Sequence, residues 1–295
     1  MNERTERVGG NLSSREALAE RWKNAPFEVY KYPAGKITDS KGKILYEYSE
    51  GARLLMLGEE VMDNCQRPWT KAAVDNAFST LDLNYKRYGN PETRYDIQVL
   101  ERGFGMGIIA SRIMDYLTIR HGSYTCIELN EQIARYADKT WRKKQNQIAR
   151  YLATSMQGGT ARDAKYLPMI IIRGDAFGKT ARLASEGRKF DIIISDTFPL
   201  SEDERSVNDL LDLETLVKCL NPDGVFAFFG YHHGFQGGMN EAQRRLVEAS
   251  FEEVNRTTVK GINPPPDYRY LNPENGPVRE LPVIICTKPR IQTVA

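Results

Sequence analysis

The sequence has no excess of charge of one sign and no long apolar run. Its 295 residues contain 41 lysines and arginines against 39 aspartates and glutamates, a formal charge of +2. Proteins that bind nucleic acid usually carry a concentrated basic excess, so this balance argues against such a partner. No apolar run approaches the ~20 residues that span a bilayer, and the N-terminus is polar and charged. We therefore expect a cytoplasmic protein with no membrane segment and no signal peptide.

Cysteine and histidine are also scarce. The four cysteines, Cys65, Cys126, Cys219 and Cys286, lie far apart and form no C-x-x-C pair, which argues against disulfides and structural zinc. No third potential ligand lies at metal-binding spacing from the adjacent His232 and His233, so we expect no metal site. The remaining composition, 41% hydrophobic and 10% aromatic, suffices for one large domain or a domain with an appended arm.

From residue 96 onward, strand-like runs alternate with helical stretches. The pattern predicts strands at 96–100, 123–129, 169–173, 190–196 and 225–230, and two strand-like pieces at 251–259 and 281–288. Helices are expected at 108–120, 131–156, 210–220 and 239–250. The run at 190–196 is almost continuously apolar, which is typical of a central parallel strand. This alternation predicts an α/β fold, a Rossmann-like, doubly wound and mostly parallel sheet with right-handed crossovers.

The first 60 residues differ from this pattern. Residues 1 to about 25 are polar and charged, as in a frayed end or a loosely docked helix. The segment 27–50 is β-rich around Asp39-Ser40-Lys41-Gly42, which predicts a small hairpin, and a helix is expected from about Met62 through Leu81. We expect an N-terminal arm and hairpin over residues 1–60 and the sheet domain over 61–295. The arm could close over the site or exchange between two copies in a homodimer.

Three glycines, Gly103, Gly105 and Gly107, follow the first strand of the sheet and Glu101. Open parallel sheets bind ligands at the carboxyl ends of their strands, and glycines there let the backbone approach the ligand closely. A dinucleotide site needs G-x-G-x-x-G, whereas the spacing here is G-x-G-x-G, and no phosphate-binding G-x-x-x-x-G-K-[ST] occurs. An E-x-G-x-G-x-G turn is typical of S-adenosylmethionine enzymes, although a plain strand-to-helix turn can carry the same glycines.

Acidic residues end the next two strands. Glu128 ends the strand at 123–129, where a carboxylate can accept two hydrogen bonds from a ribose diol; a solvated acid is the alternative. Asp175 follows the next strand, where it can face the exocyclic amine of adenine while Ala176 and Phe177 pack on the ring. NAD would use the same strand ends, so their order alone does not exclude a nicotinamide oxidoreductase. The third glycine does not have the spacing that the dinucleotide motif G-x-G-x-x-G requires, which argues against that class.

Asp196 ends the apolar strand at 190–196 and is the candidate for chemistry. A carboxylate that emerges from such a strand is partly desolvated and is a strong partner for a cationic, proton-bearing substrate. A guanidinium has no free lone pair until it loses a proton, which Asp196 could accept while holding the planar group. A turn or helix-capping aspartate is the alternative. His232 and His233 follow the strand at 225–230, and at most one of these adjacent side chains can face a pocket.

Five segments together resemble one family. They are, in order, VMDNCQRPWTKA, VLERGFGMGIIAS, DTFPLSEDE, LNPDGV and INPPPDYRY. They are similar to segments of guanidinoacetate methyltransferase and its relatives, including arginine N-methyltransferases, and the similarity runs from about Met56 to Lys288. The resemblance implies a class I methyltransferase with an N-terminal hairpin and helical extension. It further implies that S-adenosylmethionine methylates a guanidino group of a small molecule, L-arginine or a related compound.

The resemblance also implies which residues form the site. Asp196 matches the carboxylate that engages the guanidino group and is the expected catalytic residue. The expected cofactor-binding residues are Met62, Glu101, Gly103, Phe104, Gly105, Met106, Gly107, Ile108, Glu128, Leu129, Asp175, Ala176, Phe177 and Asp196. The expected substrate-binding residues are Met62, Asp63, Gln66, Asp196, Tyr231 and His232.

Two positions depart from the family pattern. The family places a second carboxylate on the guanidinium where this chain has Gln66. A neutral hydrogen bond there weakens the site for a desolvated cation by roughly 1 to 2 kcal/mol. Asp63, nearly one helical turn earlier, could substitute. Arg102, inside the loop, could pair with a ligand carboxylate or point to solvent.

These departures keep two alternatives open. One is a methyltransferase of the same fold that acts on another amine or on a carbon nucleophile, and Gln66 is its main support. The other is a binding-only protein, which we disfavour because the loop, Glu128 and Asp196 are all kept.

Overall fold

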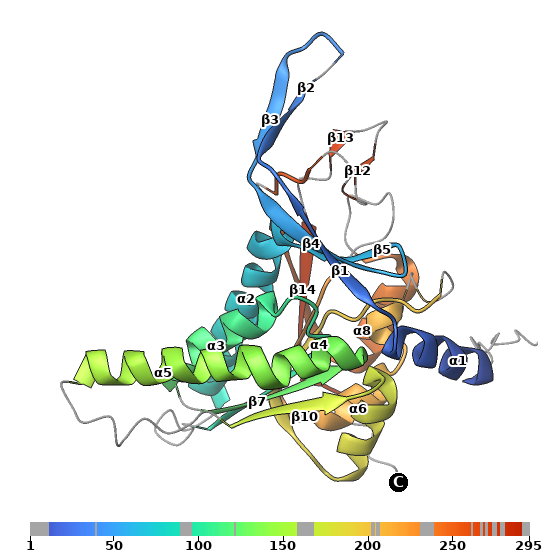
Figure 1. Cartoon of the computed structure of the whole chain (residues 1–295). Coiled ribbons are helices and arrows are strands. Elements are labelled where there is room, and N and C mark those ends of the chain that lie inside the picture. Colours follow the sequence, from blue (N-terminus) through green and yellow to red (C-terminus); the bar gives the residue numbers. More distant parts are fainter. Residues whose placement is uncertain are drawn as a thin grey trace, which may run out of the picture.

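A seven-stranded sheet forms the centre of the computed structural model (Figure 1). Its strand order is β11–β14–β10–β9–β6–β7–β8. Strands β6 (Ile97–Arg102), β7 (Gly122–Glu128), β8 (Met169–Arg173), β9 (Phe190–Ser195) and β10 (Leu220–Phe228) are parallel. Strand β14 (Leu281–Pro289) runs antiparallel between β10 and β11 (Phe251–Val259). This is a Rossmann-like, doubly wound and mostly parallel sheet, as predicted from the sequence.

The structure describes most of the chain. The described residues are 12–38, 40–88, 96–120, 122–157, 168–201, 204, 207–230, 239–260, 262–265, 268, 271–272, 276–277 and 281–290.

Helices cover both faces of the sheet (Figure 1). One face carries α2 (Arg67–Tyr88), α3 (Ile108–Arg120) and α4 (Glu131–Tyr136), and the other carries α6 (Ala176–Ser185), α7 (Leu213–Cys219) and α8 (Glu241–Ser250). Side chains alternate along β6, so Val99 packs in the first core and Leu100 in the second. The same alternation directs Glu101 toward the first face and Arg102 toward the second.

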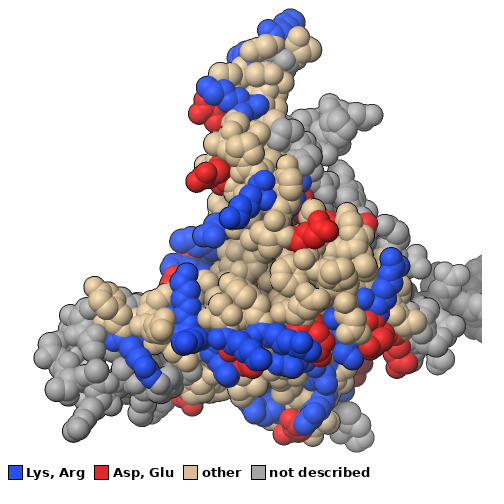
Figure 2. All heavy atoms as spheres, viewed as in Figure 1, with Lys and Arg blue, Asp and Glu red and all other residues tan. Residues whose placement is uncertain are grey.

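The basic helix predicted at 131–156 is present as one continuous helical segment, 131–157. Between α4 and α5 (Arg142–Gln157) the chain makes a π-helical turn, Ala137–Trp141. Figure 2 shows lysine and arginine side chains gathered along this run, where Lys139, Lys143 and Lys144 are exposed. Acidic neighbours partly balance them, as in the ion pair of Asp138 with Arg142 at 2.9 Å. We interpret this face as an ordinary solvated helix surface.

Several elements differ from the sequence prediction, including strand β10, which begins at Leu220 and not at 225. The helix expected from Met62 begins only at Arg67, because Met62 and Asp63 end strand β5 (Glu59–Asp63). Asp63 then caps a 3-10 turn, Asn64–Gln66, that leads into α2. In addition, the sequence analysis did not predict α6, which begins where the Asp175 carboxylate accepts a hydrogen bond from the Gly178 N–H.

The N-terminal residues form two small antiparallel sheets. Strands β1 (Phe27–Tyr32), β4 (Gly51–Met56) and β5 make one sheet. Strands β2 (Gly35–Thr38) and β3 (Ile44–Tyr48) make the predicted hairpin, which extends away from the large sheet (Figure 1). The expected boundary at residues 60/61 falls inside β5. Near the C-terminus, β12 (Leu271–Asn272) pairs with β13 (Gly276–Pro277).

All four cysteines are free. Among the helices that the structure describes, none combines the length and the apolar character needed to cross a bilayer.

A buried amide helps to join helix α1 (Leu12–Lys23) to the large sheet domain. The Asn130 Nδ2 group donates to the carbonyl oxygens of Trp22, at 3.0 Å, and Ala25, at 2.8 Å. The Asn130 Oδ1 atom accepts hydrogen bonds from two N–H groups in the first turn of α4 and so caps that helix. Asn130 therefore holds the C-terminal end of α1 against the N-terminal end of α4.

Replacing Asn130 by aspartate is expected to release α1 while α4 stays capped. The aspartate keeps the capping oxygen but lacks the two N–H donors, which leaves two carbonyl groups unsatisfied at about 1–3 kcal/mol each. Hydrogen exchange over residues 12–25 should therefore be faster in Asn130→Asp than in the wild type, with α8 as the internal reference. Equal exchange rates over 12–25 would contradict this role of Asn130.

Candidate active site

A pocket opens at the carboxyl ends of β6, β7, β8 and β9. Its volume, including the open mouth, is about 710 Å³. The sequence-predicted residues that line it are Met62, Gly103, Gly105, Glu128, Leu129, Asp175, Ala176, Phe177 and Asp196. The pocket therefore lies where an open α/β sheet is expected to bind its ligand.

Phe104 and Gly107 of the glycine loop pack behind the pocket. Phe104 is fully buried, with its ring centroid 5.2 Å from that of Trp141, and a Cβ atom on Gly107 would overlap the Phe104 ring. The expected cofactor residues that do not line the pocket are Glu101, Phe104, Met106, Gly107 and Ile108. Tyr231 and His232, expected to contact the substrate, lie outside the described residues.

Gly103 and Gly105 lie directly against residues of neighbouring segments. Gly103 has φ +90°, and a Cβ atom there would overlap the carbonyl oxygen of Asp196. Gly105 has φ +50°, and a Cβ atom there would lie 2.8 Å from the Met62 methyl carbon. The Met106 N–H also donates to the Met62 sulfur at 3.2 Å. Only glycine permits both the conformation and the close approach, so the loop presents bare backbone to the pocket.

Glu128 fixes this loop. Its Oε2 atom accepts hydrogen bonds from the N–H groups of Phe104, at 2.9 Å, and Gly105, at 3.4 Å, and its Oε1 atom accepts from Asn130 at 2.7 Å. Burial raises the pKa of Glu128, and these N–H donors oppose the rise. The carboxylate that was predicted to meet a ribose thus also orders the backbone that faces the pocket.

Three carboxyl groups meet at adjacent strand ends. Glu101 is fully buried and accepts a hydrogen bond from the Tyr124 hydroxyl. Burial raises its pKa well above the usual value, and the negative charges of Asp196 and Glu128 add to the rise. For Asp196, burial first and then the nearby Asp209 carboxylate raise the pKa to about 7. This concentration of acids suits a cationic ligand, and a pKa near 7 suits a proton acceptor at neutral pH.

Asp63 and Gln66 belong to a separate buried network. One Asp63 oxygen accepts a hydrogen bond from the Tyr32 hydroxyl at 2.5 Å, and the other lies 3.3 Å from Arg53 Nε. Gln66 Nε2 donates to the Tyr268 hydroxyl at 3.2 Å. Neither side chain lines the pocket. Asp63, expected as a replacement for the family carboxylate, is paired with Arg53, and its role toward a substrate stays a prediction.

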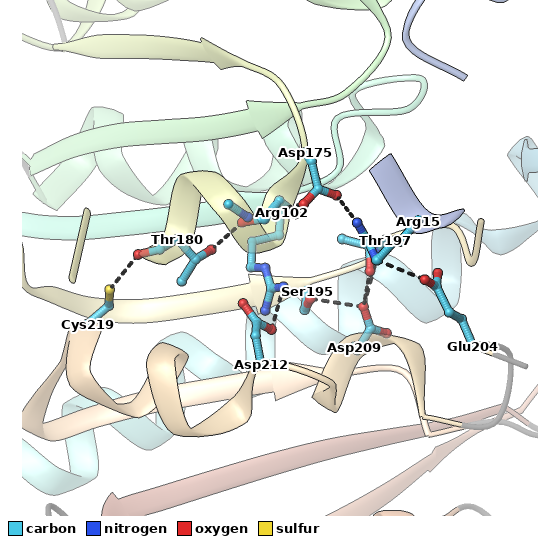
Figure 3. Close-up of polar contacts among 12 residues, drawn as sticks. Arg15, Arg102, Asp175, Thr180, Ser195, Thr197, Glu204, Asp209, Asp212 and Cys219 are labelled. Atoms are coloured by element: carbon cyan, nitrogen blue, oxygen red, sulfur yellow. Dashed lines mark hydrogen bonds and ion pairs between the residues drawn. The ribbon is translucent and has the colours of Figure 1, made fainter. Parts of the chain in front are cut away.

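Arg102 meets neither of its two expected partners, ligand and solvent. It is fully buried, and its Nη2 atom donates to Asp212 Oδ1 at 2.8 Å (Figure 3). Its guanidinium carbon lies 5.2 Å from the centroid of the Phe177 ring. The reason is the two-residue alternation of β6, which sends Arg102 under α6 and α7. Loop position alone could not reveal this direction.

The sequence analysis missed the α1 side of the pocket. Arg15 pairs with Asp175 at 2.7 Å and with Glu204 at 2.8 Å, and its guanidinium lies 4.0 Å from the centroid of Phe177 (Figure 3). Arg15 and Trp22 are seven residues apart, so they share a helix face, a signal that was present in the sequence. The unpredicted lining residues are Arg15, Trp22, Met56, Val61, Ile127, Asn130, Ile133, Thr197, Phe198 and Leu200.

Comparison with curated proteins finds two fungal relatives of the same name. The chain is 28% identical over 183 residues to Protein arginine N-methyltransferase 2 of Saccharomyces cerevisiae, which is 62% of this chain and 36% of that protein. It is 28% identical over 151 residues to Protein arginine N-methyltransferase 2 of Kluyveromyces lactis, 51% of this chain and 30% of that protein. The matches thus span about a third of each relative's length. No protein-family model matches.

Solved structures show a more distant likeness. Spermidine synthase from Thermotoga maritima has a TM-score of 0.48 at 12% identity, over 80% of this chain and 65% of that chain. Human methyltransferase-like protein 13, solved in complex with SAH, has a TM-score of 0.44 at 15% identity, over 75% of this chain and 84% of that chain.

The enzyme class predicted from the sequence agrees with the names of the curated relatives. The guanidinoacetate branch of the resemblance stays a prediction.

The close approach at Gly103 can be separated from its backbone conformation. Gly103 and Gly187 both have positive φ, but a Cβ atom on Gly187 would meet nothing within 4 Å. Alanine at Gly187 should therefore cost only about 1–2 kcal/mol, the penalty for a left-handed residue. Alanine at Gly103 should cost clearly more and should distort the pocket, as measured by denaturant unfolding. Equal losses in the two variants would contradict a tight contact between Gly103 and Asp196.

Proposed function

We propose that this chain is an S-adenosylmethionine-dependent methyltransferase that methylates a guanidino group of a small molecule, L-arginine or a related compound. The observation that carries the proposal is Asp196, a carboxylate that lines the pocket beside the glycine loop and whose pKa is raised to about 7. The two curated relatives, named as protein arginine N-methyltransferases, support the choice of a guanidino group.

The residues in the pocket fit the cofactor. Gly103 and Gly105 present bare backbone, Glu128 offers a carboxylate to ribose hydroxyls, and Ala176 with Phe177 can border the adenine. When bound, S-adenosylmethionine supplies an electrophilic methyl group on a positively charged sulfur. The acidic strand ends favour binding of that positive charge.

Asp196 prepares the substrate nitrogen for attack. A guanidinium carries its charge over all three nitrogens and has no free lone pair. The ionised Asp196 carboxylate accepts one proton from it and holds the planar group with charge-assisted hydrogen bonds. The freed nitrogen can then align with the methyl group for in-line displacement. Asp196 afterwards releases its proton to solvent. Trp22, Phe198 and Leu200 line the same pocket and limit the entry of water.

Helix α1 favours a small substrate. Arg15 and Trp22 of this helix line the pocket, and Asn130 holds the end of the helix in place. An arginine side chain within a folded protein would have to enter a pocket that Arg15 and Trp22 help to line. The names of the curated relatives nevertheless make a protein arginine the second candidate, and another amine nucleophile is the third.

Product analysis separates these candidates. The protein is incubated with S-adenosylmethionine and, separately, L-arginine, guanidinoacetate, agmatine or an arginine-containing peptide, and methylated products are detected by mass spectrometry. We expect one of the three small guanidino compounds to gain a methyl group and the peptide to stay unmodified. Methylation of the peptide alone would favour the second candidate, and methylation of none would contradict the guanidino proposal.

Asp196→Asn should keep cofactor binding but lose turnover by roughly 10²–10⁴-fold, the usual contribution of a general base, because an amide cannot accept the proton. Asp191→Asn is a matched control. Asp191 is a buried aspartate at the opposite end of β9, where it accepts hydrogen bonds from Gln98 N–H and from the Asn221 side chain. This control should keep its turnover. An unchanged rate in Asp196→Asn would remove Asp196 from its catalytic role.

The pH dependence should report the titration of Asp196. Only the ionised form accepts a proton, so kcat/KM should fall about tenfold per pH unit below about pH 7. Because the folded-state pKa is raised from 3.8, ionisation of Asp196 destabilises the folded protein as the pH rises through about 7. The free energy of unfolding should therefore decline more between pH 4 and pH 8 in the wild type than in Asp196→Asn. Identical declines would show that Asp196 has an ordinary pKa.

A further inference from the structure

Asp209 binds the residues on both sides of Asp196. It lies in a 3-10 turn, Asn208–Leu210, that packs below the end of β9. One oxygen, Asp209 Oδ1, accepts hydrogen bonds from Ser195 Oγ at 2.9 Å, Thr197 N–H at 3.1 Å and Thr197 Oγ1 at 2.8 Å (Figure 3). The two flanking residues are therefore tied to a single point, while Asp196 itself is left facing the pocket.

The backbone of Asp196 is held as well. Its N–H donates to the carbonyl oxygen of Arg102 at 3.0 Å, and its own carbonyl oxygen lies against Gly103. With the backbone and both neighbours fixed, few directions remain for the Asp196 side chain. We propose that Asp209 is a positioning residue that aims the Asp196 carboxylate at the reacting nitrogen by clamping Ser195 and Thr197. This inference rests on the proposed function of the pocket.

Asp209 also brings a negative charge close to Asp196. Like charges disfavour each other's ionised forms, and Asp209 accordingly contributes to the raised pKa of Asp196. Burial raises the pKa of Asp209, and the hydrogen bonds from Thr197 and Ser195 and the positive charge of Arg102 oppose that rise. Arg102 is itself held by its pair with Asp212. The charge of Glu101 of β6 also interacts with that of Asp196. Arg15 of α1 lines the same pocket and is paired with Asp175 and Glu204.

An amide at position 209 separates the clamp from the charge. Asp209→Asn keeps an oxygen that can accept the three hydrogen bonds but removes the negative charge. Its kcat at alkaline pH should stay within about threefold of the wild type, while the acid limb of its pH profile moves down by about one pH unit. Asp209→Ala removes both the clamp and the charge. Its kcat should fall by about 10- to 100-fold at alkaline pH, with little change in KM, and its acid limb should move down as in Asp209→Asn.

The measurement is a pH profile of kcat and KM for the wild type and both variants, with Asp191→Asn as the control whose profile should not move. Should Asp209→Ala fail to fold, Ser195→Ala tests the clamp, because it removes one of the three hydrogen bonds to Asp209; its kcat should fall with little change in KM, and an unchanged kcat would count against the clamp. An acid limb that stays in place in Asp209→Asn, or a kcat that Asp209→Ala leaves intact, would overturn the inference. A purely structural role would lower stability without shifting the profile.

A second readout does not depend on the proposed substrate. The Asp196 carboxyl carbon is followed by NMR over pH 4–9, with Asp196→Asn identifying its resonance. The apparent pKa, about 7 in the wild type, should be lower in Asp209→Asn and unchanged in Asp191→Asn. An unchanged pKa in Asp209→Asn would count against the inference, whereas absence of methylation of every guanidino compound would count against the proposed function.

Discussion

The site depends on how closely the glycine loop approaches the end of β9. At Gly103 the loop backbone leaves no room for a Cβ atom beside the Asp196 carbonyl oxygen, and the Asp196 N–H bonds to the strand that precedes the loop. One contact thus sets the distance between the backbone that would face a cofactor and the carboxylate that would face a substrate. Glu128 holds the other side of the loop with its hydrogen bonds to backbone N–H groups. Methyl transfer needs this fixed separation more than it needs any single reactive group.

Burial of several acids at one sheet edge opposes folding and favours function. Glu101, Glu128, Asp196 and Asp209 all have raised pKa values, and burial is the first cause in each case. Each therefore resists ionisation in the folded protein, and a bound cation would relieve that repulsion. The buried Arg102 provides a positive charge on the other face of the sheet, where it pairs with Asp212. Binding of a cationic ligand should accordingly stabilise the fold and the site together.

The strand ends were predictable, and the contacts between distant segments were not. Glu128, Asp175 and Asp196 follow parallel strands, whose carboxyl ends must meet at one edge, so the sequence alone placed them in one pocket. The direction of Arg102 depends on the register of β6, and Met62 and Asp63 lie on a strand because β5 pairs with β4. The docking of α1 over the pocket rests on Asn130, more than 100 residues away, which local pattern cannot reveal.

The central claim is that the pocket binds a sulfonium cofactor beside a guanidino substrate. Titration calorimetry with S-adenosylhomocysteine, the demethylated product, and separately with NAD tests the cofactor half of this claim most directly. The same titrations in Gly103→Ala, whose loop cannot keep its approach to β9, provide the matched control. We expect saturable binding of S-adenosylhomocysteine by the wild type, weaker binding by the variant, and no binding of NAD. Tight binding of NAD with none of S-adenosylhomocysteine would contradict it.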